Sequence, residues 1–268
     1  MNDLSIIIPI YYEDPTTVEN IYHGLKDMGY QVIIVDDGDT THLKVPKLTY
    51  TTHKGYGYAI KHGIQHATTS TICTLDGDGQ HNLNDVYKLW TVYQMVTDCK
   101  MVVGTRWGLN ETWFRKLGRK ALNFIATVIS GHYMVDLNSG LRVFDRQLAL
   151  GYETILCDTF SFTTSLSMSI LSDGYKTAWL PIEVSERVYG ASKVKVVKDG
   201  FITLYYIIRN GLAMRTRGLR KWLRRYTKSP WMSRATGAVA PTPHKDLAKD
   251  FQSYLKFSAH TKSKGSSS

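Results

Sequence analysis

Cysteine is scarce in this chain of 268 residues, which holds only Cys73, Cys99 and Cys157. The three are widely spaced, and they form neither a Cys-x-x-Cys pair nor a cluster with histidine. This pattern excludes the usual zinc sites and a small secreted domain held by disulfides. We therefore expect three buried thiols in a reducing compartment.

Long uncharged apolar runs are also missing. A membrane-spanning helix needs roughly 20 apolar residues, whereas the longest candidate, Ala121 to Val135, is shorter and is broken by Ser130, Gly131 and His132. The opening residues, MNDLSIIIPIYYED, have neither the basic region nor the cleavage site of a signal peptide. We expect a cytoplasmic protein with no signal peptide and no transmembrane helix.

Acidic residues are scarce in the last third of the chain. From Ala191 onward the sequence has 17 Lys and Arg against 3 Asp and Glu, a charge of +14. The first 190 residues have 16 against 20, a charge of −4, which together make the total of +10. The tail alone makes the protein basic, and such an asymmetry indicates an anionic partner rather than a fold.

Apolar strands and amphipathic helices alternate along the first half of the chain. This alternation predicts an α/β domain with a doubly wound, mostly parallel sheet. Later segments predict further helices near 115–135 and 160–171, and an edge strand at 176–184 because Pro181 lies within it. The first predicted strands are 4–10, 31–35, 47–51, 71–75 and 101–105, and the helices between them are 15–28, 58–67 and 83–96.

The stretch STICTLDGDGQH, residues 70–81, ends an apolar strand in two acidic residues, Asp76 and Asp78. Carboxylates at this spacing can point at one divalent cation, although a plain polar turn would have the same sequence. A calcium-binding EF-hand loop is excluded, because its glycine and glutamate positions hold His81 and Tyr87.

Polar residues follow three of the predicted strands at their carboxyl ends, where ligands bind in such sheets. This convergence favours a site over chance turn chemistry, and its members are Asp36, Asp37, Asp76, Asp78 and Arg106. The nearby Gly55-Tyr56-Gly57 is no dinucleotide fingerprint, because Ile60 stands where a third glycine is needed. We interpret it as a loop passing close to a nucleotide, or as a turn.

Seven short motifs follow one another over about residues 4–195: Pro9 to Glu13, Val35 to Asp39, His53 to Gly57, Asp76 to His81, Gly104 to Arg106, Asp136 to Arg142, and Arg187-x-x-Gly190-x-Ser192-Lys193. In this order they resemble the motifs of family 2 glycosyltransferases with the Rossmann-like GT-A fold. The most similar branch is that of the dolichyl- or polyprenyl-phosphate sugar synthases. Tyr12 and Tyr56 depart from the pattern, which usually has Asn and a Lys or Arg there.

The resemblance implies a metal-dependent, inverting glycosyltransferase. It would move a sugar from a UDP- or GDP-sugar to a polyprenyl or dolichyl phosphate, with Mn²⁺ or Mg²⁺ as cofactor. The implied metal ligands are Asp76, Asp78 and Gln80, and the implied nucleotide contacts are Pro9, Tyr11, Glu13, Asp36, Asp37, Gly57, Asp76 and Gly77.

The acceptor phosphate is expected to bind a second set of residues, namely Arg187, Ser192 and Lys193, which suit a phosphate. Catalytic roles are expected for Asp78 with the metal, for Arg106 on phosphate charge, and for Asp136. Asp136 would position a lipid phosphate or serve as general base towards a hydroxyl. The alternative is an Asp that merely caps a turn.

The basic tail predicts a contact with a membrane. Residues 215–228 contain seven basic residues and no acid, with Leu219, Trp222, Leu223 and Tyr226 at helical spacing. Such a basic amphipathic helix lies on anionic bilayers, which predicts a peripheral protein on the cytoplasmic membrane face. Contact with nucleic acid, or a core helix with a solvated basic face, stays open.

Three parts of the chain follow from these patterns: a catalytic domain at 1–195, a helical extension of amphipathic helices at 196–228, and a largely disordered tail at 229–268. One alternative function is the same chemistry on a glycan, a protein or a modified DNA base, with the tail as recruiter. Another is an inactive binding module, which the joint presence of Asp76, Asp78, Arg187 and Lys193 argues against.

Overall fold

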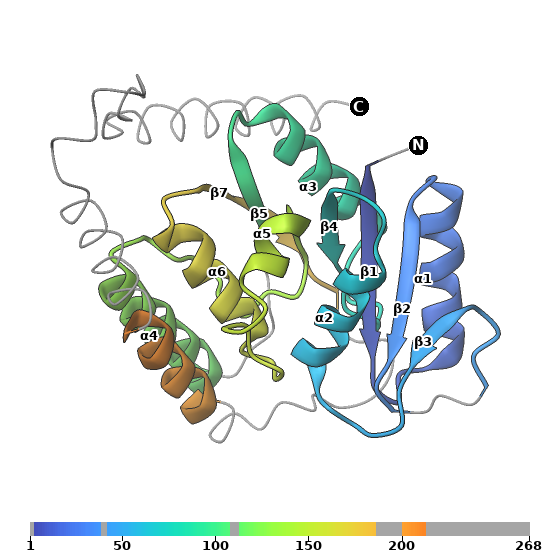
Figure 1. Cartoon of the computed structure of the whole chain (residues 1–268), viewed down its shortest axis with the longest axis horizontal. Helices are drawn as coiled ribbons and strands as arrows, with labels where there is room; N and C mark the ends of the chain where they lie inside the picture. The colour runs from blue at the N-terminus through green and yellow to red at the C-terminus, as the bar shows by residue number, and fades with distance from the viewer. Residues whose placement is uncertain (1–2, 39–41, 108–112, 186–199, 213–268) are drawn as a thin grey trace, which may run out of the picture. The chain divides into compact units, whose positions relative to one another are not determined.

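Seven strands form one sheet in the part of the chain that the computed structural model describes, residues 3–38, 42–107, 113–185 and 200–212. Their order is β3-β2-β1-β4-β6-β5-β7 (Figure 1). All neighbours are parallel except β6, which is antiparallel to β4 and β5, so the predicted mostly parallel sheet is confirmed. The strands are β1 (Leu4–Ile10), β2 (Gln31–Asp36), β3 (Lys47–Thr49), β4 (Thr71–Thr74), β5 (Cys99–Trp107), β6 (Arg142–Asp145) and β7 (Lys176–Glu183).

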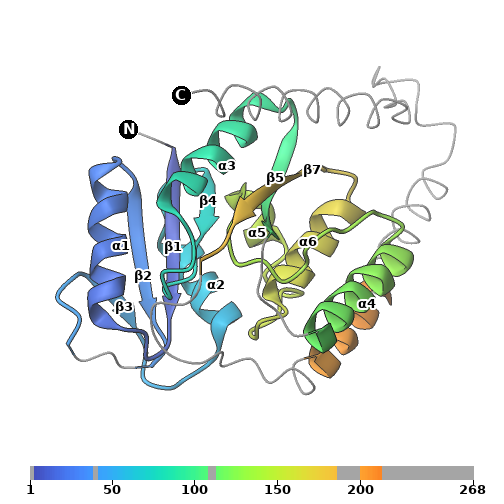
Figure 2. The same ribbon diagram turned by 180° about the vertical axis from the view of Figure 1, so that it is seen from behind.

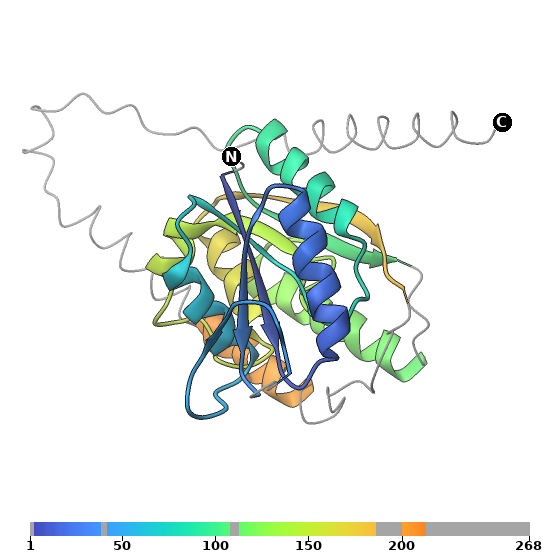
Figure 3. The ribbon, with the colours of Figure 1, turned by 90° about the vertical axis from the view of Figure 1, so that its right-hand side faces the viewer.

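Helices cover both faces of the sheet (Figure 3). The apolar side chains of α1 and α3 enter the core on one face, and those of α2, α5 and α6 enter the core on the other. A sixth helix, α4, packs against α6. The helices are α1 (Pro15–Asp27), α2 (Tyr56–His66), α3 (Leu83–Met95), α4 (Trp113–Ser130), α5 (Arg146–Gly151) and α6 (Phe162–Ser172).

The side chains of β1 connect the two cores. Leu4, Ile6, Ile8 and Ile10 point into the core under α1 and α3, whereas Ile7 points towards α2. All five are at most 1% exposed. Successive residues of a strand face opposite sides of a sheet, so a strand covered on both sides needs an unbroken apolar run.

Local signals set the ends of α1 where the sequence predicts them. The carboxylate of Asp14 accepts a hydrogen bond from the backbone N–H of Thr17 at 2.8 Å, and Pro15 occupies the first turn. Gly29 follows the helix with φ of 82°, a left-handed conformation that glycine adopts without steric cost.

The strand β6 and the short helix α5 are absent from the sequence-based prediction. Four residues are too few to show a period, and charged Arg142 and Asp145 stand at the two ends of the strand. In the structure, β6 lies between β4 and β5, and Asp145 then caps α5 by accepting from the N–H of Leu148 at 3.0 Å. The strands that lead to Asp76 and Arg106 are therefore separated by one antiparallel strand.

Residues 200–212 form a further helix that lies beside α4 (Figure 2). Ile207 joins Ala126 of α4 and Met168 of α6 in a third apolar cluster. Gly211 approaches Ile129 so closely that a Cβ atom on it would overlap the isoleucine side chain. This helix belongs to the predicted extension at 196–228. The predicted helix at 215–228 and the tail at 229–268 lie outside the described residues, and the division into three parts stays a prediction.

The three cysteines are buried and form no disulfide, as predicted. Burial raises the pKa of each thiol, to about 11 for Cys157. They are therefore structural rather than reactive groups.

Within the described ranges, no helix has both the length and the apolar composition to cross a membrane.

The packing of α2 on β1 makes a stability prediction. A Cβ atom on Gly63 would lie 2.6 Å from Cγ2 of Ile7, whereas Gly118 of α4 has open space around it. Gly63→Ala should lower the free energy of unfolding by about 1–3 kcal/mol through overpacking. Gly118→Ala should raise it by about 0.5–1 kcal/mol through helix propensity. Urea denaturation measures both, and effects of the same sign would contradict this packing.

Candidate functional site

The carboxyl ends of four parallel strands bring the predicted site residues to one edge of the sheet. β2 ends at Asp36, β4 leads into Asp76 and Asp78, and Arg106 is the last residue but one of β5. β1 ends at Ile10, just before Tyr11. Strand topology therefore produces the predicted convergence, because parallel strands end on the same side.

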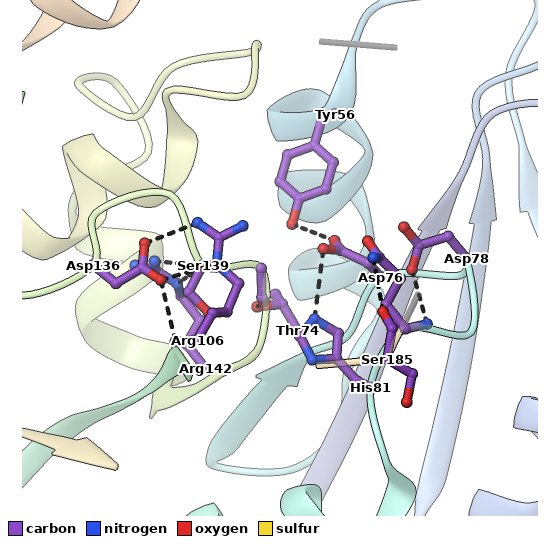
Figure 4. A network of polar contacts seen from close by, with 12 residues as sticks. Tyr56, Thr74, Asp76, Asp78, His81, Arg106, Asp136, Ser139, Arg142 and Ser185 are labelled. Atoms are coloured by element: carbon purple, nitrogen blue, oxygen red, sulfur yellow. Dashed lines mark hydrogen bonds and ion pairs between the residues drawn. The ribbon is translucent and has the colours of Figure 1, made fainter. Parts of the chain in front are cut away.

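Asp76 lies at the centre of the network in Figure 4. The hydroxyl of Tyr56 donates to Oδ1 of Asp76 at 3.0 Å, and Nε2 of His81 lies 3.9 Å from Oδ2. Gly140 packs against the same carboxylate, and a Cβ atom there would overlap both oxygens. These neighbours come from α2 and from two separate loops, so tertiary structure holds Asp76 in place.

The Asp76 side chain is a partly accessible carboxylate. Burial alone would raise its pKa, but the neighbouring His81, the hydrogen bond from the Tyr56 hydroxyl and the charge of Arg106 together hold this pKa below its ordinary value. About a third of the side chain, 34%, remains exposed. Asp76 is therefore ionised at neutral pH and can reach a ligand.

Gln80 joins the Asp76–Asp78 turn to a segment 105 residues later in the chain. The backbone carbonyl of Gln80 accepts from the N–H of Ser185 at 3.0 Å, and the side-chain Nε2 of Gln80 donates to the backbone carbonyl of Ser185 at 3.1 Å. His81 pairs with Val184 in an antiparallel bridge, and Oδ1 of Asp78 accepts from the N–H of Gln80 at 3.2 Å. The turn is thus fixed by the segment that leads towards Arg187.

The oxygens of Asp76, Asp78 and Gln80 fit a hard divalent cation such as Mg²⁺ or Mn²⁺. In the described part of the chain, no group of three or more acidic, histidine or cysteine side chains could hold a metal. Magnesium in proteins commonly takes one or two carboxylates and completes its coordination with water and substrate phosphates. The donor set therefore fits an ion that shares its coordination with a bound diphosphate.

The buried carboxylate of Asp136 forms an ion pair with Arg106, whose side chain is 22% exposed (Figure 4). Nε and Nη2 of Arg106 each donate to the carboxylate at 2.9 Å, and the backbone N–H donates at 3.3 Å. Burial alone would raise the pKa of Asp136, but these bonds and the charge of Arg106 hold it below its ordinary value. Asp136 therefore stays a carboxylate, and two donors of Arg106 already bind it.

Arg142 is fully buried and was not among the predicted site residues. Its guanidinium donates to the carbonyls of Leu137, Ser139 and Thr163 and to the hydroxyl of Ser167. Burial lowers its pKa to about 10, so it remains charged at neutral pH. Its position at the end of the Asp136 to Arg142 motif was the available signal, and its role is to hold the loop between α4 and β6.

Asp36 and Asp37 are engaged by the protein itself. Asp36 accepts from Nζ of Lys47 at 2.7 Å and from the N–H of Gly38 at 3.0 Å. Asp37 accepts from the N–H groups of Lys54 and Gly55, each at 2.8 Å. Both carboxylates therefore order the loops at this edge, and their contacts to a nucleotide stay predictions.

The aromatic pair of Tyr11 and His53 lies beside these loops, with ring centroids 4.4 Å apart. Nδ1 of His53 in turn lies 2.8 Å from the carboxylate of Asp37. Tyr11 is 36% exposed, so its ring offers a partly accessible aromatic face. Pro9 lies within β1, opposite Val35 in the register of the sheet.

The site glycines are needed for close packing of the protein. A Cβ atom on Gly57 would overlap the carbonyl of Cys157, and the N–H of Gly57 donates to the carbonyl of Asp158 at 2.8 Å. A Cβ atom on Gly77 would lie 2.7 Å from Ile10 and 3.7 Å from Glu13. The predicted loop is therefore the N-cap Gly55 and the first turn of α2, which begins at Tyr56 and packs on residues 157–159. A nucleotide contact for Gly57 stays a prediction.

The predicted acceptor-binding residues Arg187, Ser192 and Lys193 lie outside the described residues. Among the described ones, sequence reasoning missed Tyr56, His81, Gly140 and Arg142 as parts of the site. Each belongs to a motif that the sequence contains, but Tyr56 and Gly140 contact Asp76 from 20 or more residues away along the chain, and His81 pairs with the distant Val184. Only the folded chain brings them together.

Comparison with known proteins gives three kinds of match. A family model described as glycosyl transferase family 2 matches residues 5–149. Undecaprenyl-phosphate 4-deoxy-4-formamido-L-arabinose transferase of Sodalis glossinidius is 27% identical, over 74% of this chain and 64% of its own. UDP-N-acetylglucosamine–dolichyl-phosphate N-acetylglucosaminyltransferase of Methanococcus voltae is 26% identical, over 76% of this chain and 94% of its own. The chain thus spans slightly less than two thirds of the first relative and nearly all of the second.

The solved structures show the fold. Glucosyl-3-phosphoglycerate synthase from Mycobacterium tuberculosis, in complex with Mn²⁺, UDP and phosphoglyceric acid, superposes with a TM-score of 0.62 at 11% identity, covering 78% of each chain. The same enzyme with Mg²⁺ and UDP gives a TM-score of 0.60 at 13% identity, covering 77% of this chain and 78% of that one. The predicted GT-A fold is confirmed by these matches.

The ion pair of Asp136 with Arg106 makes a prediction that depends on pH. Asp136→Asn should lower the free energy of unfolding by about 2–4 kcal/mol at neutral pH, because it leaves the guanidinium without its carboxylate. The folded-state pKa of Asp136 lies below the unfolded value of about 3.9. The stabilisation is therefore present above about pH 4 and is lost as the pH falls through the folded-state pKa.

Urea denaturation at a series of pH values measures this difference between the wild type and the variant. The matched control is Asp158→Asn, because Asp158 pairs with Lys61 while 55% of its side chain is exposed. That change should cost less than about 1 kcal/mol. A cost for Asp136→Asn that does not shrink under acid conditions would contradict the depressed pKa.

Proposed function

The chain belongs to glycosyl transferase family 2, and we propose that it transfers a sugar from a nucleotide-sugar to a polyprenyl or dolichyl phosphate. It is a glycosyltransferase, as its family and its transferase relatives show. Two relatives are named for undecaprenyl-phosphate and dolichyl-phosphate acceptors, and the structural neighbours were crystallised with UDP. These names support the donor and acceptor classes that we propose.

The donor is proposed to lie across the carboxyl ends of β1, β2 and β4. The loop ordered by Asp36 and Asp37, with Tyr11 and His53 beside it, would receive the nucleoside. The diphosphate would then reach Asp76 and its neighbours. This path follows the sheet edge, where ligands bind in doubly wound folds.

The leaving diphosphate gains negative charge during transfer, and that charge must be neutralised. A divalent cation held by Asp76, Asp78 and Gln80 would act as Lewis acid for this group. Tyr56 and Gly140 hold the Asp76 carboxylate in place for that task. Ser185 does the same for Gln80.

The state of Asp136 is the observation that favours a phosphate acceptor. A general base for a hydroxyl works best with a pKa near the operating pH, whereas Arg106 depresses that of Asp136. A lipid phosphate is already anionic, so its oxygen can attack the anomeric carbon as the bond to the diphosphate breaks. Asp136 and Arg106 then act as positioning groups, with Arg187, Ser192 and Lys193 as the proposed phosphate ligands. Arg187 follows Ser185 by two residues in the sequence.

The destination of the sugar tests this function. The protein is incubated with manganese, radiolabelled nucleotide-sugars and a crude lysate, and lipid, DNA and protein fractions are separated. We expect label in the organic phase, and we expect Asp78→Asn to reduce it at least about a hundredfold by removing a metal ligand. Addition of EDTA should have the same effect.

Asp98→Asn is the matched control for this experiment, because Asp98 is exposed in a turn with φ of 60° that asparagine also adopts. It should leave the transfer unchanged. Label in DNA or protein with an empty organic phase would instead establish another acceptor, with the basic tail as recruiter.

A second prediction concerns Tyr56, which stands where the family motif usually has a Lys or Arg. Its hydroxyl binds Asp76, and its ring stacks on Phe160 with centroids 5.1 Å apart. Tyr56→Phe should keep the stacking but lower kcat/KM about tenfold and raise the metal concentration needed for half-maximal activity. Tyr58→Phe, which removes only an acceptor for Lys54, should change neither value. Equal effects of both variants would argue against a role for Tyr56 in holding Asp76.

A further inference from the structure

The helix α4 is apolar on two opposite faces. Its inner face packs into the cluster that it shares with α6, through residues such as Ala126 and Ile129. Its outer face carries Leu117, Phe124 and Val128, with exposed fractions of 56%, 68% and 63%. A helix on a protein surface usually turns charged and polar residues to solvent, so this outer face needs a partner.

The helix at 200–212 has the same character. Ile207 is fully buried in the cluster, whereas Phe201, Tyr205, Ile208 and Leu212 are between 46% and 69% exposed. These four recur at spacings of four, three and four residues, which places them in one stripe along the helix. The stripe is large, aromatic and directed away from the cluster.

The two stripes belong to neighbouring helices. Gly211 lies against Ile129, and Ala126 and Ile207 share the apolar cluster, so the helices pack side by side (Figure 2). Both stripes face away from that shared cluster. We call the outer faces of α4 and of the helix at 200–212 the aromatic surface. An exposed patch of this kind marks a site of interaction with a protein or a membrane.

Charge decides between these partners. Neither helix contains an acidic residue. Lys116 and Lys120 on α4 and Arg209 on the second helix are exposed beside the apolar stripes. A second copy of the chain would bring an equally basic surface against this one, and the two would repel. A bilayer with anionic lipids instead provides both an apolar acyl-chain region and negatively charged head groups.

We propose that the aromatic surface docks the enzyme on an anionic lipid bilayer. The apolar stripes would enter the boundary between head groups and acyl chains, and the lysines and arginine would meet the lipid phosphates. The choice of a lipid as partner extends the proposed function, because a polyprenyl phosphate acceptor resides in such a bilayer.

Hydrogen bonds connect this surface to the candidate acceptor site. Nδ2 of Asn123 on α4 donates to the carbonyl of Val135 at 2.5 Å, and Oδ1 of Asn123 accepts from the N–H of Leu137 at 3.3 Å. Asp136 stands between these two residues and binds Arg106. The helix that meets the bilayer therefore also holds the residue proposed to position the lipid phosphate.

Sedimentation with vesicles tests the docking surface in the full-length protein. We expect binding to vesicles of phosphatidylglycerol and phosphatidylcholine and much weaker binding to phosphatidylcholine alone. The double variant Phe124→Ser with Phe201→Ser should bind the anionic vesicles at least about tenfold more weakly, because two large apolar side chains leave the interface. Both side chains are exposed, so the fold should persist, which circular dichroism and thermal unfolding check.

The matched control is the double variant Tyr87→Ser with Met95→Ser, which removes two apolar side chains on α3 that are 58% and 73% exposed. It should bind vesicles as the wild type does. The proposal is overturned if the Phe124 and Phe201 variant binds as the wild type does, or if the wild type does not bind anionic vesicles. It is also overturned, in favour of a contact between copies, if the wild type is a dimer that does not bind vesicles and the Phe124 and Phe201 variant is a monomer.

Docking and transfer can fail separately. Vesicle binding needs neither donor nor metal, so Asp78→Asn protein should sediment with anionic vesicles as the wild type does. Binding without any transfer to lipid phosphate would leave the docking surface standing and refute the proposed acceptor. Transfer to a lipid phosphate in detergent, without any binding to vesicles, would support the proposed acceptor and refute the docking surface.

Discussion

The buried charge of Arg142 is the constraint on which the candidate site depends. Its guanidinium has no access to water, and the carbonyls of Leu137, Ser139 and Thr163 take the place of that water. A buried cation without such partners would be very costly. The loop before β6 must therefore keep its shape, and this shape places Gly140 against Asp76 and Asp136 against Arg106. The hydrogen-bonded guanidinium of Arg142 thus helps to position both parts of the candidate site, the one around Asp76 and the one around Asp136.

The site is also an arrangement of charges with different tasks. Asp76 remains partly exposed and ionised, which its proposed role as a metal ligand requires. Asp136 is ionised as well, but Arg106 encloses it, which suits positioning better than proton transfer. The two carboxylates of the candidate site therefore suit the different roles proposed for them because their neighbours differ. Tyr56 supports this division, since a neutral hydroxyl binds Asp76 without neutralising it.

The helix α4 joins the site to the surface of the protein. One of its faces belongs to the third apolar cluster, the opposite face is apolar and exposed, and its Asn123 holds the segment that carries Asp136. The sequence pattern directed attention to residues 215–228 as the membrane contact. The structure adds a second candidate membrane contact earlier in the chain, the exposed face of α4. The sequence did not indicate it, because apolar residues at helical spacing normally predict burial. Only the fold distinguishes the inward positions of such a helix from the outward ones.

The amino-acid sequence by itself determined the α/β class, the ends of α1, and the edge at which Asp36, Asp76 and Arg106 gather. These follow from local signals, namely apolar runs, caps and the rule that parallel strands end together. Tertiary structure alone decided the insertion of β6, the burial of Arg142, the contacts of Tyr56 and Gly140 with Asp76, and the outward stripe on α4. Each of these joins residues far apart in the chain or depends on which face of an element is covered. Such relations are set by packing of the whole domain, and no short stretch of sequence contains them.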